Sequence, residues 1–218
     1  MANIESGAIF RFNIPFNLGA AYCKVIDFSS LSMFYGITVE VYDYFDREVS
    51  DAAFFKNIPL FMNPIPIAKM PSIAGKYRWK KIGVLKEPKS RDIPFYKEYV
   101  YEGFAWETLS EYQSREWYVL IDLKDKLGPV SFDKVRHLEE LYLRSTVTIE
   151  RRVAMQLLRY RGIDVEDFLK KNSSDNGWRT DYNTQKFIPL YKTLPEAIRG
   201  RPLLKGWVPD EYLNYKWE

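Results

Sequence analysis

The chain has 218 residues, of which 46% are hydrophobic and 17% aromatic, and this apolar content excludes a wholly disordered chain. The 32 basic and 29 acidic residues leave a formal net charge of only +3, which argues against a dedicated nucleic-acid binder. The length fits one large domain, or one domain with a smaller appendage.

The first hundred residues predict β-strands, because apolar side chains alternate with polar ones in several short runs. In the clearest run, 36–45, aliphatic side chains share one face, whereas Glu40, Tyr42 and Tyr44 point to the other. The segment 57–71 carries four prolines, so we expect an edge strand or an extended connection there. The expected strands cover residues 8–14, 20–28, 36–45, 82–85, 98–104 and 116–122.

The clearest helical pattern covers residues 149–160, where apolar residues recur at spacings of four, four and three. Thr146 or Thr148 can cap the start of this helix, and Gly162 ends it. Its polar residues fall mainly on the side that we expect to face solvent. They are Glu150, Arg151, Arg152, Gln156 and Arg159.

Other parts of the C-terminal half are less regular. Residues 164–171 predict a short helix, with Asp164 as its cap and lysines in its last turn. The segment 132–143 fits a strand as well as a helix. From residue 172 onward prolines are mixed with large aromatic residues. We expect extended segments that lie across the body of the domain, with one short helix near 195–199.

Together these patterns predict a mainly β protein of the β-rich α+β type. We expect a curved antiparallel sheet or barrel, with two or three helices in the C-terminal half. Residues 1–128 would form the β-rich domain. Residues 129–218 would form a helical and extended segment packed on it, so that the chain is one compact unit.

No constellation of residues in the sequence indicates catalysis. His137 is the only histidine, no glycine-rich phosphate loop occurs, and the single cysteine, Cys23, lies within an expected strand. One cysteine also excludes an intramolecular disulfide and a set of cysteine ligands for zinc. We therefore expect no enzyme activity, catalytic residue, metal site or cofactor. A carboxylate-based hydrolase that uses Glu40, Asp43 or Asp46 stays open as an alternative.

Two basic segments keep a nucleic-acid-binding alternative open. Residues 76–81 interleave lysine and arginine with aromatic residues, and arginines recur in 151–161. The ordinary interpretation is an amphipathic strand in the first case and a solvated helix face in the second. We therefore expect a protein, rather than a nucleic acid, as the partner.

Segments that direct a chain to or across a membrane are not evident in the sequence. The N-terminal residues lack the basic segment, apolar run and cleavage site of a secretory signal. No apolar stretch reaches the roughly 20 residues that span a bilayer. We therefore expect a cytoplasmic protein without a membrane partner.

The N-terminal half resembles the immunity proteins of bacterial polymorphic toxin systems, and in particular immunity protein family twenty-six. Three strand-like segments with short spacers carry the resemblance, in the order in which the family has them. They are residues 7–15 (GAIFRFNIP), 20–25 (AAYCKV) and 39–44 (VEVYDY), with a weaker echo at 79–83 (WKKIG). The helical segment after residue 129 and the aromatic tail have no counterpart in this resemblance.

The resemblance implies a cytoplasmic β-domain that binds and neutralises a protein toxin, without catalysis or a cofactor. Interfaces of this kind use aromatic anchors together with charged residues. The candidate contact residues are Glu40, Tyr42, Tyr44, Arg78 and Trp79. For the tyrosines, packing between strands within the sheet is the alternative interpretation.

Overall fold

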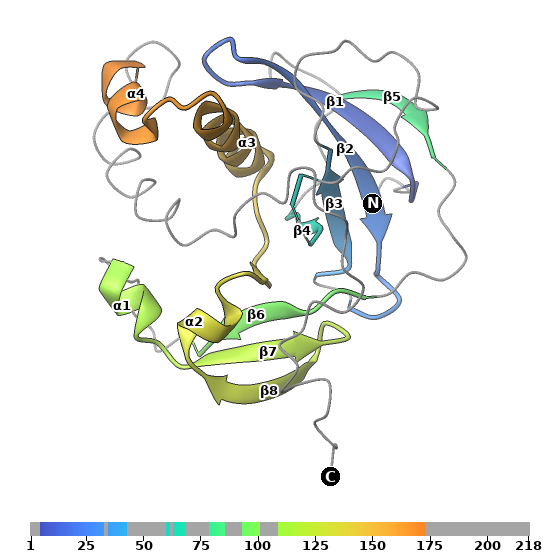
Figure 1. Cartoon of the computed structure of the whole chain (residues 1–218). Helices are drawn as coiled ribbons and strands as arrows, with labels where there is room; N and C mark the ends of the chain where they lie inside the picture. The colour runs from blue at the N-terminus through green and yellow to red at the C-terminus, as the bar shows by residue number, and fades with distance from the viewer. Residues whose placement is uncertain are drawn as a thin grey trace.

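A computed structural model describes residues 5–32, 35–42, 60–61, 63–68, 79–85, 93–100 and 109–172. In these residues the chain forms two β-sheets and four helices (Figure 1). The strands are β1 (Ala8–Ile14), β2 (Gly19–Asp27), β3 (Ile37–Val41), β4 (Ile65–Pro66), β5 (Lys80–Val84), β6 (Tyr96–Tyr99), β7 (Trp117–Ile121), β8 (Asp125–Val130) and β9 (Glu139–Glu140). The helices are α1 (Leu109–Gln113), α2 (Phe132–Val135), α3 (Thr146–Tyr160) and α4 (Val165–Asn172).

The first sheet has five antiparallel strands in the order β4-β3-β2-β1-β5. Alternation along β1, β2 and β3 gives it one fully apolar face, because successive side chains of a strand point to opposite sides. Helix α3 lies across this face (Figure 1). The core between them contains Phe12, Val25 and Val39 from the sheet, together with Ile149 and Val153 from α3.

Helix α4 is held against α3 and the turn between β1 and β2. Met155 and Leu158 of α3 pack with Leu169 of α4, and the rings of Phe16 and Phe168 meet edge to face at 5.3 Å. The cap is the expected one, because the Asp164 carboxylate accepts a hydrogen bond of 2.8 Å from the amide of Asp167.

The second sheet has four strands in the order β8-β7-β6-β9. Its pairs are antiparallel except for β6 and β9, which are parallel. Its aromatic core joins β7 to the two short helices, since the ring of Trp117 lies 4.8 Å from that of Tyr112 on α1 and 5.3 Å from that of Phe132 on α2. Edge-to-face and tilted contacts at these distances are favourable for aromatic rings.

One short segment joins the two sheets. Residues 139–144 begin as β9 at the edge of the second sheet and end at Arg144, which forms a parallel bridge with Ile67 next to β4. The amide of Arg144 donates to the carbonyl of Pro66, and the amide of Ala68 donates to the carbonyl of Arg144. This segment therefore forms backbone hydrogen bonds with both sheets, and we call it the junction strand.

The structure confirms the mainly β fold class with helices in the C-terminal half. Of the two forms expected, it shows open curved sheets rather than a closed barrel. Three of the four described helices, α2, α3 and α4, follow residue 128, in agreement with the two or three expected there, and the short helix α1 was not predicted. The proline-rich strand β4 lies at the edge of its sheet, as expected.

Several boundaries differ from the expected ones for local reasons. The cap of α3 is Ser145, whose hydroxyl accepts from the amide of Thr148, so neither expected threonine is the cap. The segment 132–143 contains one helical turn and then β9, so both interpretations hold in part. Residues 128 and 129, the expected limit between the two parts of the chain, lie within β8.

The expected solvent side of α3 is wrong for two residues, since Arg152 and Gln156 are both only 2% exposed. Helical spacing alone assigns long polar side chains to water. Here the side of α3 that carries Arg152 and Gln156 is buried as well as the apolar side, and Arg152 forms an ion pair with the buried Glu139. The expected aromatic tail after residue 172 lies outside the described residues.

Candidate functional site

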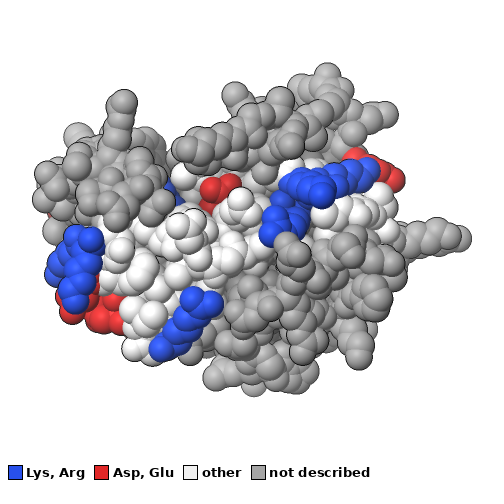
Figure 2. All heavy atoms as spheres, turned by 90° about the horizontal axis from the view of Figure 1, so that it is seen from above, with Lys and Arg blue, Asp and Glu red and all other residues white. Residues whose placement is uncertain are grey.

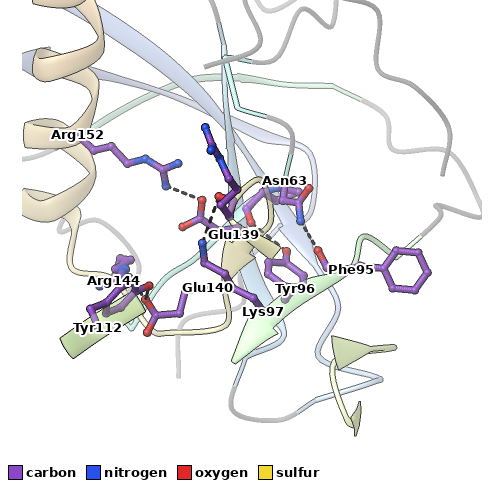
Figure 3. A network of polar contacts seen from close by, with 11 residues as sticks. Asn63, Phe95, Tyr96, Lys97, Tyr112, Glu139, Glu140, Arg144 and Arg152 are labelled. Carbon is purple, nitrogen blue, oxygen red and sulfur yellow. Dashed lines mark hydrogen bonds and ion pairs between the residues drawn. The ribbon is translucent and has the colours of Figure 1, made fainter. Parts of the chain in front are cut away.

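Five ionisable side chains are buried where the junction strand meets α3 and the second sheet (Figure 3). Burial of this many charges is costly unless they compensate one another. We call this set the junction network. It consists of Lys97 on β6, Glu139 and Glu140 on β9, Arg144 at the end of the junction strand, and Arg152 on α3.

The pair of Glu139 and Arg152 connects the second sheet to α3. The guanidinium nitrogen Nη1 of Arg152 donates a hydrogen bond of 2.7 Å to Oε2 of Glu139, and both side chains are almost completely buried. Burial lowers the pKa of Arg152, and the Glu139 carboxylate acts in the opposite direction. The guanidinium also lies 3.9 Å from the ring centroid of Phe61. This pair fixes the position of α3 over the sheets.

Glu140 binds two neighbours through one oxygen. Its Oε2 accepts a hydrogen bond of 3.0 Å from Nη2 of Arg144 and one of 3.2 Å from the hydroxyl of Tyr112. Arg144 is part of the junction strand and Tyr112 belongs to α1. Glu140 therefore ties α1 to the end of the junction strand.

Lys97 occupies the most apolar position of the network and is fully buried. Its ammonium nitrogen lies 4.8 Å from the ring centroid of Phe132 and 5.5 Å from that of Trp117, and it donates one hydrogen bond of 3.3 Å to the carbonyl of Arg136. Burial lowers the pKa of Lys97 to about 8, although two nearby glutamates act in the opposite direction.

The junction network has an excess of positive charge. Three cations, Lys97, Arg144 and Arg152, face two carboxylates at neutral pH. Arg144 pairs with Glu140 and Arg152 with Glu139, so Lys97 is the third cation of this set of five. The ion pairs and hydrogen bonds of this network hold α1, α3 and the two sheets together. Within the described ranges, no cluster of three or more histidine, cysteine or acidic side chains has the geometry of a metal site.

An exposed aromatic residue lies directly beside the network. Tyr142 is 55% exposed, the highest value among the large apolar side chains of the described residues, and the only aromatic one in that group. The guanidinium of Arg144 lies 4.7 Å from its ring centroid, within the range of a cation–π contact. Val147, in the first turn of α3, is also exposed. We call Tyr142, Arg144 and Val147 the junction surface.

The contact residues expected from the sequence lie in other places. Glu40 is buried and pairs with Lys24 at 3.2 Å. Tyr42 is fully buried and packs with Ile9 and Tyr22, which is the packing between strands that the sequence left open. Tyr44, together with Arg78, lies outside the described residues.

Trp79 is also buried, between β1 and α3. Its ring stacks on Phe12 with centroids 4.5 Å apart, and its indole nitrogen donates a hydrogen bond of 2.6 Å to Glu150. Burial raises the pKa of Glu150, while the hydrogen bond from Trp79 acts in the opposite direction. Trp79 thus connects the first sheet to α3.

On the face shown in Figure 2, the described lysine and arginine side chains form separate groups with other residues between them. In the first of the two basic segments Lys80 and Lys81 are exposed, and Lys81 pairs with Glu5 at 2.5 Å. In the second, Arg159 and Arg161 are exposed, whereas Arg152 points inward.

The residues considered for catalysis are likewise separated or undescribed. Of the three carboxylates considered, Glu40 is engaged with a lysine, and Asp43 and Asp46 lie outside the described residues. His137 is partly buried after α2, and Cys23 is buried in the core of the first sheet. Burial raises the pKa of the Cys23 thiol, which disfavours the reactive thiolate.

Sequence reasoning did not identify the junction network or the junction surface. One signal was present: two adjacent glutamates in the segment 138–143, which otherwise carries leucines and a tyrosine. Acidic residues in so apolar a run need partners if the run is buried. The sequence does not say which cations supply them.

The charge excess leads to a prediction for Lys97→Met. The folded-state pKa of about 8 lies below the roughly 10.4 of a free lysine, so the unfolded chain binds more protons between these values. Wild-type stability should therefore rise across that window, by up to about 3 kcal/mol from this residue. Methionine removes the buried charge, and we expect Lys97→Met to be about 2 kcal/mol more stable at pH 7, with the difference shrinking by pH 9.5.

Urea unfolding of both proteins at pH 7 and pH 9.5 measures this effect. Lys126→Met is the matched control, because Lys126 is about half exposed and its pair with Glu98 is a surface pair. We expect that control to differ from the wild type by less than about 1 kcal/mol at either pH. A Lys97→Met protein that is less stable than the wild type at pH 7 contradicts the assignment of Lys97 as a buried cation whose charge lowers the stability of the fold.

Comparison of the chain with protein-family models, with curated proteins and with solved structures gives no match. In the described part of the chain, none of the helices combines the length and the apolar character needed to cross a bilayer.

Proposed function

We propose that this chain is a cytoplasmic protein-binding module, and that it acts as an immunity protein that neutralises a bacterial toxin by direct complex formation. It works by binding, without catalysis and without a cofactor. The partner contacts the junction surface. The observation that carries the proposal is the position of Tyr142, a large exposed aromatic side chain that the protein holds in place.

The support for a binding role comes from how Tyr142 is held. Arg144 packs over its ring, and Glu140 holds Arg144 through an ion pair of 3.0 Å. Glu140 and Arg144 are both largely buried, so the guanidinium that packs against the Tyr142 ring is held in one position. An aromatic anchor that is ordered before binding loses little conformational entropy in the complex. Tyrosine is also among the residues that contribute most to the stability of protein complexes.

The support for a toxin as the partner is the resemblance of residues 7–44 to immunity protein family twenty-six. In the structure these residues include β1, β2 and β3, which are consecutive antiparallel strands. In this proposal the sheet is the scaffold, and the junction strand presents the contact side chains. The surface differs from the one that the sequence favoured, because the described residues of that earlier set are buried.

Growth rescue tests the proposal. The toxin domain encoded beside the gene for this chain is expressed in bacteria with and without the chain. We expect growth only when both are present, and a stable one-to-one complex when the purified proteins are mixed. Growth arrest that the chain does not relieve, or a gene neighbourhood without a toxin, counts against the proposal.

Tyr142→Ala should weaken the complex by about 30-fold or more, the effect of losing about 2 kcal/mol at a binding hot spot. The expected reason is the loss of the only exposed aromatic anchor among the described residues. Isothermal titration calorimetry with the purified toxin domain measures the affinity. Circular dichroism should show an unchanged fold, because this side chain is mostly in solvent.

The matched control for Tyr142→Ala is Leu31→Ala. Leu31 is an exposed apolar residue of comparable kind, 40% exposed, in the turn after β2. We expect its removal to change the affinity by less than about threefold, in line with the small contributions of most surface residues. Equal losses for both variants would assign the interface to another part of the chain.

A further inference from the structure

The junction surface shares Arg144 with the junction network. The five buried ionisable groups of that network are three cations and two anions. The guanidinium of Arg144 is only 4.7 Å from the exposed ring of Tyr142, so a group bound to that ring comes close to the network. Charges act over longer distances in the interior than in water, because the effective dielectric constant is lower there.

The start of α3 adds to this potential. Val147 is exposed in the first turn of the helix, two residues after the cap Ser145. The first turn of a helix carries a partial positive charge and backbone N–H groups without helical partners. Ser145 accepts from the amide of Thr148 and thus satisfies one of them. A negatively charged group next to Val147 would be favoured for the same reason as anions at other helix starts.

From these observations we infer that the junction surface selects a partner segment that carries carboxylates next to an apolar or aromatic side chain. The apolar group packs on Tyr142 and Val147. The carboxylates lie close to Arg144 and the first turn of α3, and they offset the charge excess that Lys97 produces. The inference rests on the proposed function and names the chemistry of the partner at that site.

Lys97 makes the inference testable without any change in the surface itself. The groups around its ammonium are Glu139 and Glu140 from β9, Arg144 at the end of the junction strand and Arg152 from α3. The aromatic rings of β7 and α2, and a carbonyl at the end of α2, complete its surroundings. When Lys97 loses its proton, the network becomes neutral, with two arginines and two glutamates.

A capped hexaglutamate peptide, with a capped hexalysine peptide as its opposite, is the probe. Each is titrated into the full chain at pH 6.5 and low salt, and backbone amide signals are followed by NMR. We expect hexaglutamate, and not hexalysine, to shift signals at residues 142–148. We expect affinity to weaken by about threefold to tenfold in Lys97→Met, the size of effect that one partly screened charge produces.

A titration of the wild type supplies a second measurement that needs no variant. Hexaglutamate affinity should fall as the pH rises from 7 to 9, and this fall should be absent in Lys97→Met. Hexalysine binding of equal strength, shifts centred elsewhere, or an affinity that is the same in both proteins would overturn the inference. If those results appear while Tyr142→Ala still weakens toxin binding, the proposed function stands and only the acidic preference is lost.

Discussion

Glu139→Gln is expected to lower the free energy of unfolding by about 3 kcal/mol or more. Arg152 is buried on α3, and Glu139 accepts its hydrogen bond of 2.7 Å. Glutamine keeps the size of the side chain but removes the negative charge. The buried guanidinium would then lose the carboxylate of its 2.7 Å ion pair, while a second arginine, Arg144, stays close enough to disfavour its charge. Guanidinium chloride unfolding monitored by tryptophan fluorescence measures the loss.

Two controls separate this effect from a general effect of removing glutamates. Glu98→Gln removes a carboxylate whose pair with Lys126 is partly exposed, and it should cost less than about 1 kcal/mol. The double variant Glu139→Leu with Arg152→Met removes both buried charges, and it should recover most of the lost stability. A Glu139→Gln protein as stable as Glu98→Gln would show that the buried pair does not hold α3 in place.

Trp79→Ala is expected to cost about 3–5 kcal/mol, the range for removing a large aromatic side chain from a core. Trp79 is 1% exposed, stacks on Phe12 of β1 and donates a hydrogen bond to Glu150 of α3. Its loss leaves a cavity between the first sheet and the helix. It also leaves the partly buried Glu150 carboxylate without that donor. Thermal and chemical unfolding should both show the change.

Trp79→Phe distinguishes the two contributions. Phenylalanine can keep the stack on Phe12 but has no N–H group, so it should cost about 1–3 kcal/mol, the range for a hydrogen bond to a charged group. The sequence favoured Trp79 as a partner contact. A Trp79→Ala protein that is as stable as the wild type but does not bind its partner would restore that interpretation and contradict the structural role.

Local patterns predicted most of the first sheet. Strict alternation in 8–14 and 36–45 identified β1 and β3, because one face of each strand is apolar. The spacing of apolar residues identified α3 in the same way. Strand β8 was missed, since Asp125–Val130 has only one buried side chain and thus no alternating pattern. Strand β9 was ambiguous because it has only two residues.

The candidate site could not be predicted in the same way, because its contacts are distant in the sequence. Lys97 and Glu139 are far apart in the chain, and the pairing of β6 with β9 brings them together. Arg152 has the helical position of a solvated residue and is buried only because α3 packs over the junction strand. With 32 basic and 29 acidic residues, no pattern in the sequence indicates which pairs form.

The exposure of side chains explains why the contact residues proposed from the structure differ from those expected from the sequence. Tyr42, the residue after β3, belongs to the polar-aromatic face predicted for 36–45, and such a face would be accessible to a partner if the sheet were exposed on that side. In the structure both faces of β3 are buried, so Tyr42 packs with its strand neighbours. The exposed aromatic residue is instead Tyr142, in a segment that the sequence left open between helix and strand.

Hydrogen–deuterium exchange on the complex with the neighbouring toxin domain tests the central claim most directly, namely that the partner sits where the two sheets meet. Binding should slow amide exchange in a continuous stretch from residue 142 to residue 149, and leave the turn around Leu31 unchanged. Protection confined to other parts of the chain, with 142–149 exchanging at its free rate, would contradict the claim.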